Sequence, residues 1–217
     1  MAKKNTLRET KVVTGNVIIV FPQLFEPRAV EEGGEKKYSA RLIIPKSDKR
    51  TIMRIKQARQ NAIENGLERH WNGKKPKKFE VKELLDGDEF NEERVGDGEE
   101  PRPEMVDAYY LNVNSKLKPE VVKPVGKTPE GRVKFAPIED EDEIYPGVIA
   151  RASINFYCYN LTSSKGVTAG LNSVVKVMDG DFLGSGRTSA SADFADEDFD
   201  IDGLDADEDE DVDLDLD

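Results

Sequence analysis

The stretch VIARASINFYCY, residues 148–159, is the longest alternating run in the chain. Apolar side chains occupy every second position from Val148 to Cys158, and the positions between them are mostly polar or aromatic. Because a strand places successive side chains on opposite faces, this run predicts a strand with one face in a core. Its other face carries Arg151 and two tyrosines, rings that an outer face does not need for packing.

Four more segments predict strands over residues 12–21, 37–45, 108–115 and 169–178. The first is rich in β-branched residues, and residues 37–45 and 108–115 alternate in the same way. The segment FPQLFEP, residues 21–27, contains two prolines and is predicted to be irregular. After the second strand, Ser47 predicts the N-cap of a helix that runs to about Asn65 and stops at Gly66. Five strands with one helix between the second and third predict a mainly β protein. A small five-stranded barrel of the oligonucleotide-binding (OB) type fits this order, with a β-sandwich as the alternative.

Charge and composition divide the rest of the chain. Residues 66–107 lose the periodicity and pass from a lysine-rich to an acidic stretch, which predicts a long, partly mobile charged insertion. Residues 193–217 hold 15 carboxylates and no lysine or arginine, which predicts a disordered tail that acts in interactions. The remaining 29 acidic residues face all 32 basic ones, so the body is slightly basic. We therefore expect a binding domain over residues 1–187 and an acidic tail over residues 188–217.

Residues 36–82 are the most basic part of the body, with 15 basic and four acidic residues. Four lysines within residues 74–78 lie between Trp71 and Phe79. Cations that follow phosphates, beside rings that stack on bases, are typical of single-stranded nucleic-acid binding. The alternative is a solvated surface loop, with Trp71 covering the end of the helix.

Tyrosines on the polar strand faces point to the same chemistry. Tyr110, Tyr157 and Tyr159 are candidate stacking residues, and the alternative is a second small core beneath the charged insertion. Arg151 lies on the same predicted face as Tyr157 and is a candidate phosphate contact, and the alternative is an ion pair with one of the carboxylates of residues 139–143. The predicted nucleic-acid-binding residues are Lys37, Arg41, Trp71, Lys74, Lys75, Lys77, Lys78, Tyr110, Asn112, Arg151, Tyr157 and Tyr159.

The sequence offers little support for catalysis. A single cysteine and a single histidine exclude a Cys/His zinc cluster, and we expect neither a metal nor a cofactor. Asp86, Asp88 and Glu89 are spaced closely enough to suggest a divalent ion, which keeps a metal-dependent nuclease as a weak alternative. The longest apolar run, residues 17–21, is far too short to cross a bilayer, and the protein is predicted to be cytoplasmic.

Five segments of the chain carry a resemblance to a known family: YSARLIIPKSDKRTI (38–52), ELLDGDEF (83–90), YYLNVNSKLKPEVV (109–122), EIYPGVIARASINFYCYN (143–160) and AGLNSVVKVMDGDFLG (169–184). They closely resemble the OB-fold single-stranded-DNA-binding proteins of tailed bacteriophages, in the right order between residues 11 and 186. The resemblance implies an OB barrel with a helix between its second and third strands, which binds single-stranded DNA without sequence preference. The family's cleft is matched in kind here by Lys37, Arg41, Tyr110, Arg151 and Tyr157.

The resemblance also implies an acidic C-terminal tail that contacts replication proteins. This tail ends in VDLDLD, with Phe194 and Phe199 further back, whereas related binding proteins end in an aromatic residue. Its carboxylates can also compete with DNA for a basic groove, as a phosphate mimic.

We expect a protein that coats single-stranded DNA in phage replication and recombination inside the bacterial host cell, and not an enzyme. Through residues 193–217 it would recruit a polymerase, a helicase or primase, or a recombinase. An acidic-tailed adaptor or chaperone that binds only proteins is the alternative. The sequence leaves both a homodimer and RNA binding open.

Overall fold

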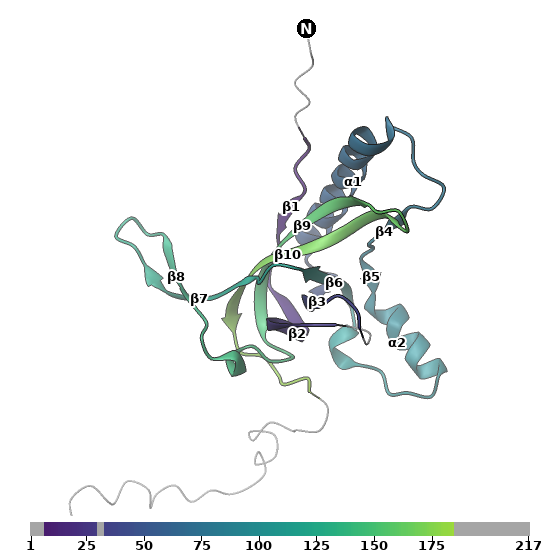
Figure 1. Cartoon of the computed structure of the whole chain (residues 1–217). Helices are drawn as coiled ribbons and strands as arrows, with labels where there is room; N and C mark the ends of the chain where they lie inside the picture. The colour runs from purple at the N-terminus through teal and green to yellow at the C-terminus, as the bar shows by residue number, and fades with distance from the viewer. Residues whose placement is uncertain (1–6, 30–32, 185–217) are drawn as a thin grey trace, which may run out of the picture. The chain divides into compact units, whose positions relative to one another are not determined.

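The computed structural model describes residues 7–29 and 33–184, which form a mainly β structure with two α-helices (Figure 1). The strands are β1 (Lys11–Val13), β2 (Val17–Arg28), β3 (Lys37–Pro45), β4 (Glu80–Val81), β5 (Leu85–Asp86), β6 (Ala108–Ser115), β7 (Glu120–Lys127), β8 (Val133–Pro137), β9 (Ile149–Asn160) and β10 (Lys165–Met178). The helices are α1 (Lys49–Trp71) and α2 (Gly87–Gly96), with short 3-10 turns at Pro103–Met105 and Glu141–Glu143. Neither α-helix of this described part is long and apolar enough to span a membrane.

Five strands pair in a closed ring, in the order β9, β2, β3, β6, β10 and back to β9. The longest pairing joins β9 and β10 in an antiparallel hairpin, whereas β10 meets β6 in parallel. β1 extends the sheet beyond β9, and β7 and β8 extend it beyond β10. A strand is therefore present at each of the five predicted positions, with the first one divided into β1 and β2.

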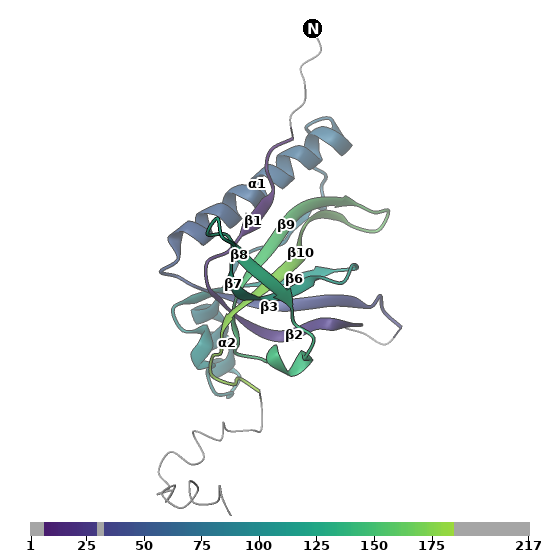
Figure 2. The ribbon, with the colours of Figure 1, turned by 90° about the vertical axis from the view of Figure 1, so that its left-hand side faces the viewer.

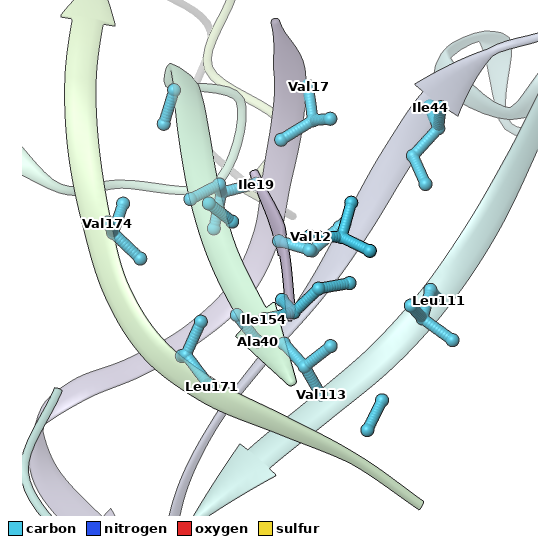
Figure 3. Close-up of a cluster of buried hydrophobic side chains, with 14 of the residues drawn as sticks. Val12, Val17, Ile19, Ala40, Ile44, Leu111, Val113, Ile154, Leu171 and Val174 are labelled. Atoms are coloured by element: carbon cyan, nitrogen blue, oxygen red, sulfur yellow. The ribbon is translucent and has the colours of Figure 1, made fainter. Parts of the chain in front are cut away.

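The side chains that point into this ring form the main core (Figure 3). Leu42, Leu111, Ile154 and Leu171 from four different strands are all buried in it. Phe156 on β9 is 1% exposed and is the largest of the fully buried side chains. The inward face predicted for residues 148–158 is thus confirmed, apart from Cys158, which is only partly buried.

α1 begins one residue later and ends later than the sequence predicted. Asp48, not Ser47, is the N-cap, and its side chain accepts the backbone N–H three residues further on at 3.0 Å. The predicted stop at Gly66 is wrong, because the helix continues to Trp71. Gly66 is buried where α1 packs on β9, and a β-carbon at this position would collide with Cys158. This glycine therefore permits close packing and does not end the helix.

The segment FPQLFEP belongs to β2, so the prediction of an irregular segment is wrong. Its pairing with β3 shifts in register twice, between Val20 and Gln23 and between Gln23 and Arg28. A β-bulge leaves a residue out of the hydrogen-bonded ladder, and a proline can occupy such a place without ending the strand.

The charged insertion contains β4, β5 and α2, so part of the stretch that lacks apolar periodicity is regular structure. Asp86 caps α2, and Nζ of Lys46 lies 2.7 Å from a carboxylate oxygen of both Asp86 and Asp88. On the helix itself, the Asn91 amide donates to Arg102 O at 2.9 Å and accepts from Arg102 N at 2.8 Å. These contacts are polar, which is why apolar periodicity did not reveal the helix.

The connection between β6 and β9 forms an additional hairpin of β7 and β8, which projects from the remaining strands (Figure 1). β7 is attached to β10 by parallel pairing at Ser173–Val175, whereas β8 pairs with β7 alone in the described residues. The sequence predicted no strand here, because Pro124 interrupts β7 and Pro137 is the last residue of β8.

Candidate nucleic-acid interface

Two adjoining hollows form one groove along β3, β6 and the β9–β10 hairpin. The first hollow has a volume of about 690 Å³ and includes Phe21 and Arg41. The second has a volume of about 520 Å³ and includes Tyr157. Lys37 and Asn114 line both hollows, so the two are continuous. In Figure 2 the β9–β10 hairpin and the paired ends of β2 and β3 project to the same side of the molecule.

Arg41 on β3 is held among aromatic rings at one end of the groove. Its guanidinium carbon lies 4.7 Å from the ring centre of Tyr110, 5.3 Å from that of Phe21 and 5.8 Å from that of Phe90. Its Nε donates to Oδ1 of Asn112, directly opposite on β6, at 2.8 Å. Burial lowers the pKa of Arg41, but an arginine remains a cation at neutral pH. The rings and Asn112 fix the guanidinium plane, which prepares its other donors for an anion in the groove.

Phe21 is the exposed ring beside this cation. Its side chain is 53% exposed, and its backbone φ of 52° lies in the left-handed region, which bulky residues rarely occupy. The residue sits in the first bulge of β2, between the pairs Val20↔Arg41 and Gln23↔Ser39. Bulges redirect side chains, and strained backbone of this kind concentrates at functional sites. The bulge thus supplies a free ring face next to Arg41.

Tyr157 provides the exposed ring at the other end of the groove. It is 44% exposed, and it lies across Gly170 of β10, where a β-carbon would sit 3.0 Å from its Cε1 atom. Tyr159 follows on the same strand, and its hydroxyl donates to Oε2 of Glu80 at 3.2 Å. Burial and the neighbouring Glu80 carboxylate raise the pKa of Tyr159, so its hydroxyl stays a donor at neutral pH.

Cations predominate along the groove between these rings. Lys37 and Lys116 both contact the carboxylate of Glu35, the former at 3.3 Å. The hydrogen bond from Lys116 lowers the pKa of Glu35, so this carboxylate is ionised and already occupies a position between two lysines. A phosphate could take its place. The basic lining residues are Arg28, Lys37, Arg41, Lys82 and Lys116, against the acidic Glu35 and Glu80.

Five of the predicted residues line this groove: Lys37, Arg41, Asn112, Tyr157 and Tyr159. Tyr110 lies directly beneath, but it is only 9% exposed and packs in a second buried cluster with Val20, Ile43, Met105 and Ala108. This placement matches the alternative of a second small core. Tyr110 presents no free face to a base, and its ring supports Arg41.

The structure does not bring Arg151 into the groove. It lies six residues before Tyr157 on β9, about 20 Å along a strand. Its Nε donates to Thr14 O at 3.2 Å, next to the start of α1. Arg151 and Tyr157 do lie on the same face of β9, but about 20 Å of strand separates them, and Arg151 is not among the residues that line the groove.

Trp71 and the lysine-rich loop also lie outside the groove lining. The Trp71 ring packs edge-on against Phe79 with 5.6 Å between ring centres, which matches the alternative that it covers the end of α1. Nζ of Lys75 lies 5.5 Å from the Phe79 ring centre. The loop with Lys74, Lys75, Lys77 and Lys78 runs directly into β4, whose Glu80 lines the groove.

The carboxylates that suggested a nuclease stabilise the start of α2. Both Asp86 and Asp88 bind Lys46, and Asp88 also accepts Asp107 N at 3.0 Å. The hydrogen bond from Lys46 lowers the pKa of Asp88, so the carboxylate is ionised and paired at neutral pH. Residues 7–29 and 33–184 contain no group of three side chains placed to hold a metal ion.

Sequence reasoning missed four residues of the groove, namely Phe21, Arg28, Lys82 and Lys116. Phe21 was assigned to the end of an ordinary strand, and only the bulge shows that its ring is exposed. The proline that follows Phe21 was the one local signal of a break in the ladder. The three cations lie in segments without periodicity, so no pattern indicated their direction.

A cation-lined groove with an exposed ring at each end is the kind of surface that holds an extended single strand of nucleic acid. Comparisons with known proteins agree with this class. Residues 10–208 match the family model described as "Enterobacter phage Enc34, ssDNA-binding protein". The chain therefore belongs to this family of phage single-stranded-DNA-binding proteins, a family of binding proteins and not of enzymes.

Individual relatives support the assignment. Protein p50 of Acyrthosiphon pisum secondary endosymbiont phage 1 is 30% identical over 191 residues, 86% of this chain and 93% of that protein. The single-stranded-DNA-binding protein of bacteriophage Enc34, solved in complex with single-stranded DNA, is 26% identical with a TM-score of 0.57 and covers 81% of this chain and 90% of its own. A C-terminal truncation of the same Enc34 protein is 25% identical with a TM-score of 0.55, and the match covers 80% of this chain and 88% of that one.

Proposed function

We propose that the protein binds single-stranded DNA, without sequence preference, in the groove between Phe21 and Tyr157. The observation that carries the proposal is the arrangement of this groove, where an aromatic-caged Arg41 and an exposed ring lie at one end and Tyr157 at the other. Arg28, Lys37, Lys82 and Lys116 would follow the phosphates, and the two exposed rings would stack on bases.

The closed ring of β9, β2, β3, β6 and β10, with α1 between its second and third strands along the chain, is the basis for assigning an OB-type barrel. We propose residues 1–187 as the DNA-binding domain and residues 188–217 as the acidic tail. The lysines of residues 74–78 would give a further, non-specific contact with the strand where it leaves the groove. Tyr110 and Asn112 would act through Arg41, as positioning residues.

The direct test is a salt titration with fluorescent single-stranded and duplex oligonucleotides. A handful of phosphate contacts predicts a log-log slope of roughly −3 to −5, at about −0.7 per neutralised phosphate, for the single strand. Equal affinity for duplex and single strand over the whole titration would contradict the assignment.

Replacing Tyr157 by alanine should weaken binding of a single strand by about 1 to 2 kcal/mol, roughly 5- to 30-fold, because a stacked base is lost. The salt slope should stay unchanged, since no charge is removed. Fluorescence anisotropy at several salt concentrations measures both quantities. Replacing Tyr38, a partly buried tyrosine outside the groove lining, is the matched control and should leave the affinity unchanged.

The acidic tail has a proposed role of its own, although it lies outside the described residues. Its 15 carboxylates would compete with phosphates for the groove and, once displaced by DNA, become available to replication proteins of the host or phage. The functional setting would be replication and recombination of phage DNA in the cytoplasm of the host cell. An adaptor that binds only proteins is disfavoured, because it would not need a cationic groove with free rings.

Deleting residues 193–217 should tighten binding to a short single strand by roughly tenfold in dilute buffer. The difference should shrink as salt is added, because screening weakens the competing carboxylates. Isotherms of the full-length and the deleted protein at two ionic strengths measure the effect. Equal affinities in dilute buffer would leave the tail with solubility or partner binding alone.

A further inference from the structure

In residues 7–29 and 33–184, the hairpin of β7 and β8 leaves one edge of the sheet open, at β8. In the antiparallel hairpin, Ile138 N donates to Val121 O at 3.0 Å and Thr128 N donates to Arg132 O at 2.7 Å. Because hydrogen-bonded pairs alternate along such a ladder, the backbone groups of Val133 and Phe135 point away from β7. The opposite end of the sheet is different, because β1 has only three residues and packs beside α1.

Side chains along this edge alternate between basic and apolar. Lys134 of β8 and Arg132, which directly precedes the strand, are on one side, and Val133 and Phe135 share the other face. Val133 is 47% exposed and Phe135 is 52% exposed, which leaves an apolar strip beside the open edge. Among the described residues, neither Arg132 nor Lys134 makes an ion pair, so the charge on this face is uncompensated.

One alternating segment of the sequence, DVDLDLD at residues 211–217, lies outside the described residues. Strict alternation over seven residues is the pattern of a half-buried strand. In an added strand, residues directly opposite each other lie on the same face of the sheet. An aspartate can then oppose Arg132 and Lys134 while a leucine opposes Val133 and Phe135, so acidic and apolar positions match basic and apolar ones.

We propose that residues 211–217 dock on β8 of the same chain as an additional edge strand. Main-chain hydrogen bonds would pair with the free groups of Val133 and Phe135, and the aspartates would neutralise Arg132 and Lys134. A lysine on an edge strand discourages pairing with unrelated chains, but its charge favours pairing with a strand that is rich in aspartate.

The same chain can supply the segment because the intervening sequence is long. Between Gly184 and Asp211 there are 26 residues, which extend up to about 90 Å and have a root-mean-square span of roughly 30 Å as a flexible chain. A domain of this size has a radius of gyration of about 16 Å, so every surface point is within reach. Tethering gives an effective concentration in the millimolar range, well above that of a second copy in dilute solution.

This site differs from the groove competition proposed above, and one variant separates the two. V212N/L214N/L216N retains all 15 carboxylates of the tail but loses the apolar face of the added strand. It should therefore bind single-stranded DNA like the wild type in dilute buffer. If the variant loses docking on β8 but binds single-stranded DNA as tightly as the wild type, docking on β8 and competition for the groove are separate properties of the tail.

The experiment is hydrogen exchange on the full-length protein, followed by mass spectrometry of peptides that span residues 129–138. If the effective concentration of residues 211–217 is close to the dissociation constant of their contact with β8, amide exchange in the wild type should be about two- to fivefold slower than in V212N/L214N/L216N. Peptides from β9 should exchange equally in both. V133P, which removes an edge N–H and leaves the ladder with β7 intact, should match the triple variant, whereas the control V133T should match the wild type.

Charge reversal supplies a second arm. R132E/K134E should lose the protection, and R132E/K134E combined with D213K/D215K should regain it, because opposite charges then face each other again. Equal exchange in the wild type and the triple variant overturns the proposal. Protection that rises with protein concentration also overturns it, because the segment would then come from a second copy.

Discussion

Replacing Arg41 by methionine should weaken binding of a single-stranded oligonucleotide by about 10- to 100-fold at moderate salt. A hydrogen bond between charged groups contributes about 1.5 to 3 kcal/mol, and Arg41 presents a guanidinium that its surroundings already hold in place. Methionine keeps the packing against Tyr110 and Phe21 but carries no charge. The salt slope should therefore fall in magnitude by about 0.7, one phosphate for a single strand.

Two further variants test whether the effect comes from the position and shape of the Arg41 side chain or from net charge alone. R41K keeps the charge without the planar fork and should restore the slope but only part of the affinity. R151M removes one cation from the same sheet, far from the groove, and should change neither quantity much. Equal losses in R41M and R151M would mean that net charge, and not the groove, determines binding.

Replacing Phe156 by alanine should lower the free energy of unfolding by about 3 to 5 kcal/mol, because the ring leaves a cavity in a core that cannot fully collapse. Phe156 is 1% exposed and belongs to the main core cluster. For a domain of this size, the loss corresponds to a fall in melting temperature of roughly 6 to 20 °C. Calorimetry or chemical denaturation monitored by circular dichroism measures it.

The neighbouring residue provides the control for this prediction. Tyr157 points to the opposite face of β9, so Y157A should change stability by less than about 1 kcal/mol while it weakens DNA binding. F156A that remains folded at low temperature should bind DNA like the wild type. If Y157A destabilised the protein as much as F156A, the two faces of β9 would not be separated as the structure has them.

Alternation predicted the position and the inward face of the main strands correctly, because each strand of the ring has one face in the core. At residues 148–158 the apolar positions are those that the structure buries, with Cys158 only partly covered. The predictions failed where a residue that is typical of a local feature is present for tertiary packing instead. Gly66 was taken as a helix stop, but it is the place where α1 approaches β9 closely.

In the candidate site too, the sequence indicated which types of residue bind but not where each of them lies. The sequence indicated that cations and rings on polar strand faces form a binding surface, and five of those residues line the groove. It could not distinguish Tyr110 from Tyr157, since both lie on outer faces, yet one is buried beneath the charged insertion and the other is free. That difference depends on contacts across the fold.

By itself, the sequence determined a mainly β body, a basic central region, an acidic tail and membership of a phage family that binds single-stranded DNA, because periodicity, charge and resemblance are properties of the linear chain. Only the tertiary structure decided which rings are free and where the groove runs. The bulge at Phe21, the position of Arg41 among three rings and the distance of Arg151 from Tyr157 depend on the pairing and register of strands far apart in the chain. Local sequence does not specify that register.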